Sequence, residues 1–185
     1  MTPAPGLMTV DEYFRTPLTV KPMELAHGRL RVADSPSPRH QSAVASLFRA
    51  LDWHVRSLQL GEMWLAPLDV VLSERDALIV QPDLFFIAAD RKRSVLVNEH
   101  IYGAPDLVIE VLSPKPRIGD TEERVGWFAA HGVRECWLLQ QTELKLAVLQ
   151  FRNGGVSGRK LFEKRDAIVS SVLPNFKSSL EEIFD

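Results

Sequence analysis

The chain has 185 residues, of which 45% are hydrophobic and 25% are charged, an ordinary composition for a globular protein. This length suits one domain with a hydrophobic core, and we expect a single domain over residues 1–185. A net charge of −2 indicates no overall basic field for nucleic acid, although a locally basic cleft stays open. The single cysteine excludes an internal disulfide and a cysteine-based zinc site.

Neither a membrane segment nor an export signal is evident. No apolar run reaches the length of a membrane span, and the N-terminus lacks the basic and then apolar layout of a signal peptide. We therefore expect a protein of the cytoplasm that does not bind membranes.

The first third of the chain predicts a short helix, a hairpin and a long helix. Thr9, with Glu12 three residues later, forms a capping box. Apolar residues on both sides of His27–Gly28 indicate a β-hairpin. Hydrophobic residues then recur at three- and four-residue steps from Val44 to Leu58, which predicts an amphipathic helix.

Two acidic strands follow in the middle of the chain. One is Val80–Ile87, which contains Pro82 and Asp83, and the other is Ala104–Pro114. Both run from a Pro-Asp turn into β-branched and aromatic residues, a pattern typical of buried strands. We expect further strands before them, around Met63–Leu65 and Leu68–Leu72.

The last third predicts a helix, a strand, a hairpin and a small terminal helix. The first helix follows Pro114 and ends at Gly132, a common residue for a left-handed helix end. Glu135–Leu139 is an apolar strand, and Asn153–Gly155 marks the hairpin turn. The order of elements favours an α/β fold with one mixed β-sheet and helices on both faces.

Glu110 lies in the middle of an apolar strand, between Ile109 and Val111. A lone buried carboxylate costs roughly 2–7 kcal/mol or more unless something compensates it. If the strand that holds Asp83 is the neighbour, Asp83 can meet Glu110 at the sheet end. Two converging carboxylates form a hard oxygen site suited to Mg²⁺ or Mn²⁺. An ion pair of Glu110 with Arg124 or another arginine stays open as a purely structural alternative.

The residues near these acids also have plain structural interpretations. Asp106 follows a proline, and we expect it to be a structural turn residue. Glu24 is equally compatible with an exposed strand position. His40, at the start of the long helix, could reach a cleft, but a cap or a solvated residue is the simpler expectation.

An ordered series of motifs runs through nearly the whole chain. Its segments are Met23–Leu25 with His27–Gly28, Ser37–Gln41, Ala66–Val70, Gln81–Leu84, Gly103–Pro114 and Gly132–Leu138. This series resembles the Uma-type family of restriction endonucleases, a branch of the PD-(D/E)XK nuclease superfamily. One Pro-Asp dipeptide would be uninformative, whereas the ordered series is specific.

The resemblance implies a restriction-endonuclease-like α/β fold with a Mg²⁺-type site. Asp83 and Glu110 would be the metal ligands, with the carbonyl of Val111 as a third oxygen. Glu24 would be an additional acidic residue of the site, and Arg124 would act on the phosphate. The implied activity is hydrolysis of phosphodiester bonds in nucleic acid, with DNA as the expected substrate.

The chain departs from the family pattern at the basic residue. The superfamily motif calls for a lysine two residues after the glutamate, where this chain has Leu112. The family takes the lysine from the next helix, at the position of Arg124. Arginine keeps its proton at working pH and cannot act as a base, although it can stabilise charge. Lys115 is a candidate substitute, and Arg117 suits phosphate contact.

Two function hypotheses follow from these residues. The first is a metal-dependent endonuclease, and the resemblance also admits a homodimer because nucleases of this fold often use paired sites on two strands. The second is a catalytically inactive fold-mate that binds nucleic acid or a partner protein. The arginine at the lysine position and the acidic pI favour the second hypothesis somewhat. Fold alone does not decide between them.

Overall fold

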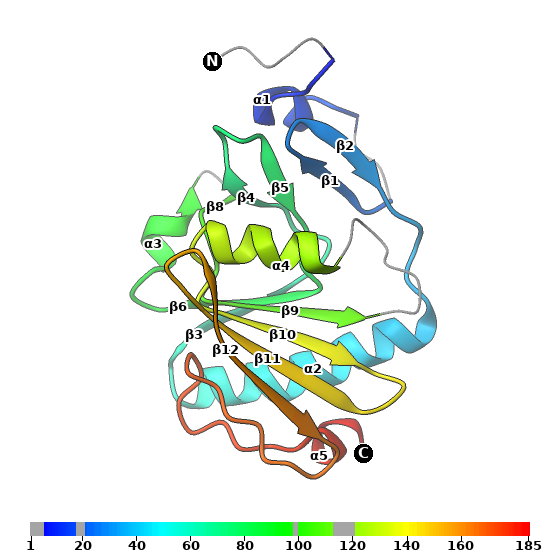
Figure 1. The fold of residues 1–185 in the computed structure, drawn as a ribbon, viewed down its shortest axis with the longest axis vertical. Helices are drawn as coiled ribbons and strands as arrows, with labels where there is room; N and C mark the ends of the chain where they lie inside the picture. Colours follow the sequence, from blue (N-terminus) through cyan, green and yellow to red (C-terminus); the bar gives the residue numbers. More distant parts are fainter. Residues whose placement is uncertain (1–5, 18–20, 98–99, 113–120) are drawn as a thin grey trace.

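The computed structural model describes residues 6–17, 21–97, 100–112 and 121–185. Within these residues the strands form two six-stranded sheets (Figure 1). The N-terminal sheet has the strand order β2-β1-β5-β4-β8-β7, and the central sheet has the order β12-β11-β10-β9-β6-β3. Each sheet is mixed, with one parallel pair among antiparallel ones: β4 with β8, and β9 with β10.

The strands of the N-terminal sheet are β1 (Met23–Ala26), β2 (Arg29–Val32), β4 (Val70–Ser73), β5 (Leu78–Val80), β7 (Leu96–Val97) and β8 (His100–Tyr102). Those of the central sheet are β3 (Gly61–Leu65), β6 (Leu84–Ala88), β9 (Leu107–Leu112), β10 (Glu135–Gln140), β11 (Lys145–Arg152) and β12 (Gly155–Glu163). The helices are α1 (Val10–Phe14), α2 (Pro38–Ser57), α3 (Lys92–Val95), α4 (Thr121–Ala130) and α5 (Leu180–Phe184).

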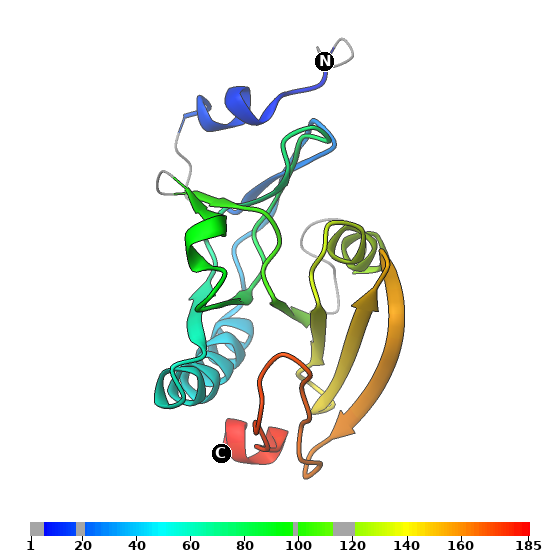
Figure 2. The same cartoon turned by 90° about the vertical axis from the view of Figure 1, so that its left-hand side faces the viewer.

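The middle strands of the central sheet, β6 and β9, are buried on both faces. Leu107 and Ile109 of β9 pack into a core formed with α2 and α5, whereas Val108 packs into a second core with Phe128 of α4. Figure 2 shows α2, in cyan, and α4, in yellow-green, apart from each other. Burial on both faces explains why β9 is a nearly continuous apolar run instead of an alternating one.

The predicted α/β class, with a mixed sheet flanked by helices, is confirmed, but the strands divide into two sheets instead of one. The predicted strand Val80–Ile87 is accordingly wrong as one element. Strand β5 ends at Val80 in the N-terminal sheet, and β6 begins at Leu84 in the central sheet. Pro82 lies in this crossover, and proline cannot donate to a strand ladder, so pairing is interrupted there.

The local signals for turns and caps are confirmed. Thr9 and Glu12 form a capping box on α1, and Ser179 and Glu182 form another on α5. The β1–β2 turn has φ values of 50° at His27 and 79° at Gly28, as a tight hairpin turn with left-handed residues requires.

Among the described residues, no helix combines the length and apolar character needed to cross a membrane.

Asp106 is structural, as expected, and is fully buried at the start of β9. Its carboxylate accepts a hydrogen bond of 2.9 Å from the backbone N–H of Ala88. It also forms ion pairs of 3.0 Å with Arg91 and 3.2 Å with Arg134. These contacts fasten the end of β6 and the turn before β10 to the start of β9, the strand that carries Glu110.

Asp106→Asn should destabilise the fold by about 1–3 kcal/mol, because the amide loses charge-assisted bonds that cannot be replaced in a buried position. Urea unfolding measures this loss. Asp52→Asn is the matched control, since Asp52 pairs with Arg56 across one turn of α2 at the surface. Equal stability of the two variants would contradict the structural role of Asp106.

Candidate active site

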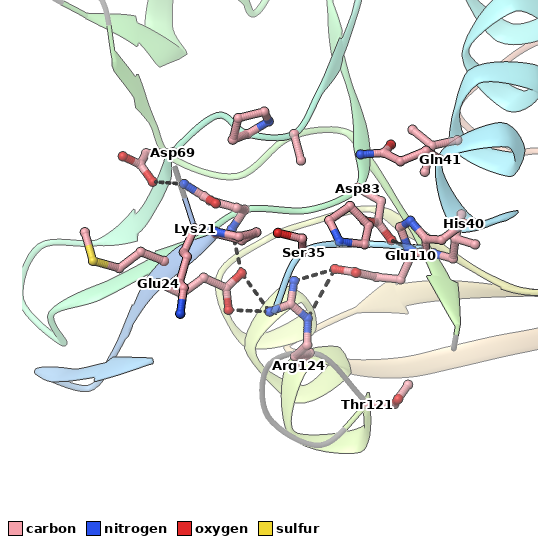
Figure 3. Close-up of a pocket in the computed structure, with 18 of the residues that line it drawn as sticks. Lys21, Glu24, Ser35, His40, Gln41, Asp69, Asp83, Glu110, Thr121 and Arg124 are labelled. Atoms are coloured by element: carbon pink, nitrogen blue, oxygen red, sulfur yellow. Dashed lines mark hydrogen bonds and ion pairs between the residues drawn. The ribbon is translucent and has the colours of Figure 1, made fainter. Parts of the chain in front are cut away.

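A cavity of about 410 Å³ brings residues from both sheets, α2 and α4 together (Figure 3). The crossover from β5 to β6 forms part of its wall, since Gln81 and Asp83 both line it. The titratable residues on which its chemistry depends are Glu24, His40, Asp69, Asp83, Glu110 and Arg124.

Asp83 and Glu110 meet as the sequence predicts. Strands β6 and β9 are antiparallel, with Leu84 opposite Ile109, so Asp83 just before β6 lies next to Glu110. The Oδ2 atom of Asp83 accepts a 2.8 Å hydrogen bond from the backbone N–H of Val111. The strand pairing itself therefore holds the two carboxylates at one end of the central sheet.

Glu110 projects from the face of β9 that is turned towards α4. It shares this face with Val108, because side chains alternate along a strand. Its Oε1 atom accepts hydrogen bonds from Arg124, 3.2 Å from Nε and 2.6 Å from Nη2. Burial raises the pKa of Glu110 to about 7, against a lowering by the positive charge of Arg124 and a further rise caused by Asp83.

Arg124 connects Glu110 to Glu24. Its Nη1 atom donates to both carboxylate oxygens of Glu24, at 2.8 Å and 2.6 Å, and its guanidinium lies over the ring of Phe128. Burial alone would lower the pKa of Arg124, but Glu110 and Glu24 raise it above its ordinary value. Arg124 is therefore a permanent cation between the two acids.

Glu24 is a buried residue of β1, with 1% exposure, so the alternative of an exposed strand position is wrong. One of its oxygens also accepts a 2.6 Å hydrogen bond from the backbone N–H of Gln81. Glu24 belongs to the N-terminal sheet and Glu110 to the central sheet. Through Arg124 the two sheets are joined by a buried chain of charges.

His40 is neither a cap nor a solvated residue, so that expectation is wrong. It lies in the first turn of α2, where Ser37 is the residue whose side chain caps the helix. The His40 side chain is buried, and its Nε2 atom lies 3.2 Å from Oδ2 of Asp83. The position of His40 in the sequence does not indicate a contact with Asp83. The one sequence signal for His40 is that it lies in Ser37–Gln41, a segment on which the family resemblance rests.

Sequence reasoning missed a second polar group in the same cavity. Asp69 accepts 2.9 Å hydrogen bonds on Oδ1 from the hydroxyl of Tyr13 and from the side-chain amide of Gln81. Burial raises the pKa of Asp69 above its ordinary value. These three residues are distant in sequence, and neither their periodicity nor their spacing indicates that they meet.

The metal-ligand set predicted from the resemblance is only partly visible in the geometry. Asp83, Glu110 and Val111 line one cavity, but the described residues contain no group of three or more histidine, cysteine, aspartate or glutamate side chains arranged to hold a metal ion. The predictions for Lys115 and Arg117 lie outside the described residues.

The fold and the cavity define an α/β protein of the restriction-endonuclease-like class, with acidic residues at the end of its central sheet. Residues 10–181 match the Uma2 family, described as "Putative restriction endonuclease", and the chain belongs to this family. A solved structure described as a putative nuclease belonging to DUF820 from Anabaena variabilis ATCC 29413 is similar in fold. Its TM-score is 0.78 at 20% identity, over 96% of this chain and 97% of that one. No curated protein matches the sequence.

Glu24→Gln should lower the free energy of unfolding by about 3–5 kcal/mol, because it leaves Arg124 buried with an incomplete set of counter-charges. Chemical denaturation measures the loss. Glu123→Gln is the control, since Glu123 pairs with Arg31 at the surface, where such pairs contribute about 0–1 kcal/mol. A loss no larger than that of the control would show that the Glu24–Arg124 pair does not join the sheets.

The raised pKa of Glu110 predicts a pH dependence of stability. Its pKa moves from 4.5 to about 7 on folding, so its contribution is complete below pH 4.5 and is lost as the pH rises through 7. Relative to Glu110→Gln, whose amide does not titrate, the unfolding free energy should fall by on the order of 3 kcal/mol over this range. Urea titrations of both proteins at several pH values test this, and a constant difference would refute it.

Proposed function

We propose that this chain is a divalent-metal-dependent endonuclease that hydrolyses phosphodiester bonds in nucleic acid, with DNA as its substrate. The proposal rests on one observation above all. In a chain of this family, Asp83 and Glu110 converge in one cavity at the end of the central sheet. Glu110 lies within β9, and Asp83 lies directly before β6 with its carboxylate bonded to the N–H of Val111, so the two carboxylates are preorganised for a cation.

The residues present fit a magnesium-type ion in their chemistry. Mg²⁺ prefers oxygen ligands and is commonly held by one or two carboxylates, with water and substrate phosphate completing its shell. Asp83 and Glu110 would hold the ion, and the carbonyl of Val111 would add an oxygen. The ion would polarise the scissile phosphate and lower the pKa of a water molecule.

The other residues of the site would position and balance these groups. His40 and the N–H of Val111 both lie against Oδ2 of Asp83 and fix the orientation of that carboxylate. Arg124 remains protonated, so it would stabilise negative charge on the phosphate and would not accept a proton. Glu24 holds Arg124 in place through two hydrogen bonds.

A second candidate function, a catalytically inactive nucleic-acid- or protein-binding module, is favoured by the pairing of Arg124. The guanidinium donates two hydrogen bonds to Glu24 and two to Glu110, and so acts as an internal counter-ion for the acids. A cation of the protein itself would then replace the metal. Cytoplasmic location and a homodimer stay predictions under both functions.

Wild type and Glu110→Gln should differ sharply in a cleavage assay. Labelled single- and double-stranded DNA and RNA are incubated with Mg²⁺ or Mn²⁺, and Mg²⁺ binding is measured by calorimetry on the same preparations. We expect metal-dependent cleavage that falls at least about 100-fold in Glu110→Gln, because a metal ligand is lost. Glu62→Gln is the control, since Glu62 pairs with Lys92 away from the cavity.

Arg124→Lys separates the two candidate functions. A lysine provides a titratable amine and forms fewer hydrogen bonds to Glu110 than the guanidinium does. Cleavage should therefore increase if the site is a nuclease. Cleavage by Arg124→Lys with an inert wild type would indicate a nuclease that has lost activity. No cleavage and no saturable metal binding in either protein would refute the proposed function and leave the binding module.

A further inference from the structure

Strand β12 is the longest of the described strands that lie at the edge of a sheet. It has nine residues, Gly155–Glu163, and it ends the strand order of the central sheet. Figure 2 shows β12, in orange, at the right-hand margin of the molecule. Among the described residues, no strand pairs with its outer edge. A long edge of this kind offers unpaired backbone N–H and C=O groups to a further strand.

Two hydrogen bonds show which residues of β12 direct their backbone groups outward. The N–H of Lys164 donates to the carbonyl of Leu144, so the even-numbered residues in the second half of β12 pair with β11. The N–H of Glu163 donates away from β11, to a side chain of the following turn. The backbone N–H and C=O groups of Arg159 and Leu161 therefore point out of the sheet.

The side chains along this edge are apolar at the centre and charged on both sides. Leu161 is 55% exposed, and Arg159 and Glu163 beside it are exposed as well. Because side chains alternate along a strand, these three lie on one face of the sheet. Glu163 lies 3.8 Å from Lys145, and Arg159 forms no ion pair with any described residue. The edge thus carries a positive charge before Leu161 and a negative charge after it.

We propose that β12 pairs antiparallel with β12 of a second copy of this chain, so that the two central sheets become one continuous sheet across a twofold axis. The axis passes beside Leu161, which lies opposite Leu161 of the partner subunit. Arg159 then lies opposite Glu163 of the partner subunit, and the twofold symmetry repeats this pair. Opposite charges and an apolar pair directly across two strands both stabilise such a contact.

The charges of β12 select this register over its neighbours. Only every second register brings the outward-facing backbone groups of both strands together. The next such register on one side places Lys160 opposite Lys160 of the partner subunit. The next on the other side places Arg159 opposite Arg165 of the partner subunit. Like charges directly opposite each other are destabilising, so the edge is self-complementary in the register centred on Leu161. This self-complementarity favours a second copy over an unrelated strand.

Sedimentation velocity of the full chain over a range of concentrations tests the proposal without any assay of cleavage. We expect a reversible dimer of the weak class, because a single strand edge buries little surface. Arg159→Glu should raise the dissociation constant at least about tenfold, since it places two carboxylates opposite each other. Combination with Glu163→Arg exchanges the charges and should restore the dimer. Arg152→Glu, an equal change of charge at an exposed position outside the paired segment, is the matched control and should keep the dimer.

Cysteine cross-linking tests the position of the axis. Opposite residues of a hydrogen-bonded antiparallel pair have Cα atoms about 5.5 Å apart, which a disulfide can span. Leu161→Cys should therefore form a disulfide-linked dimer on mild oxidation. Val156→Cys, at an equally exposed position of the same strand, should not. The native Cys136 is fully buried and does not compete.

A monomer at every concentration would overturn the proposal. A dimer of unchanged affinity in Arg159→Glu would overturn it as well, because the interface would then lie elsewhere. A folded charge-exchange variant that stays monomeric, or equal cross-linking of the two cysteine variants, would overturn the register and with it the proposal. These outcomes concern assembly alone, so the dimer and the proposed metal-dependent cleavage can fail separately.

Discussion

The buried ion chain Glu24–Arg124–Glu110 is the interaction on which the arrangement of the two sheets depends. Glu24 is on the N-terminal sheet, Glu110 on the central sheet, and Arg124 on the helix between them. Burying these groups carries a large desolvation cost, which only their mutual contacts offset. Asp83 then adds a further carboxylate close to Glu110. Burial is the main cause that raises the pKa of Glu110, and the charge of Asp83 raises it further against the lowering by Arg124.

The same break in the chain separates the sheets and creates the cavity. Because Pro82 cannot continue the ladder of β5, the chain leaves one sheet there and enters the other. The backbone N–H of Gln81 donates a hydrogen bond to Glu24, while the carboxylate of Asp83 accepts one from the backbone N–H of Val111. A continuous strand would have kept both residues in a single sheet, with their side chains on the same face. The crossover instead lets both line a cavity that also contains residues of both sheets.

Much of the fold and part of the site could be predicted from the sequence. The Pro-Asp turns and the apolar strands follow from local pattern, whereas the meeting of Asp83 with Glu110 is predicted on the condition that their strands are neighbours and from the family resemblance. The split into two sheets does not follow from local pattern, because apolar runs carry no information about which strands pair. His40 and Asp69 could not be placed for the same reason. Their partners lie 43 and 56 residues away, and only tertiary packing brings them together.

Arg124 marks a conflict between stability and metal chemistry. Its planar guanidinium forms more hydrogen bonds to the two acids than a lysine ammonium could, and it stays protonated at working pH. The same grip engages an oxygen of Glu110 that a metal ion would otherwise use. Any ion that binds must share Glu110 with the guanidinium or displace the guanidinium from it. Displacement would weaken the Glu24–Arg124–Glu110 contacts that connect the two sheets. The arginine therefore strengthens the fold at the position where the resemblance leads one to expect a lysine, and in the proposed nuclease metal affinity and the docking of the sheets would be coupled through Glu110.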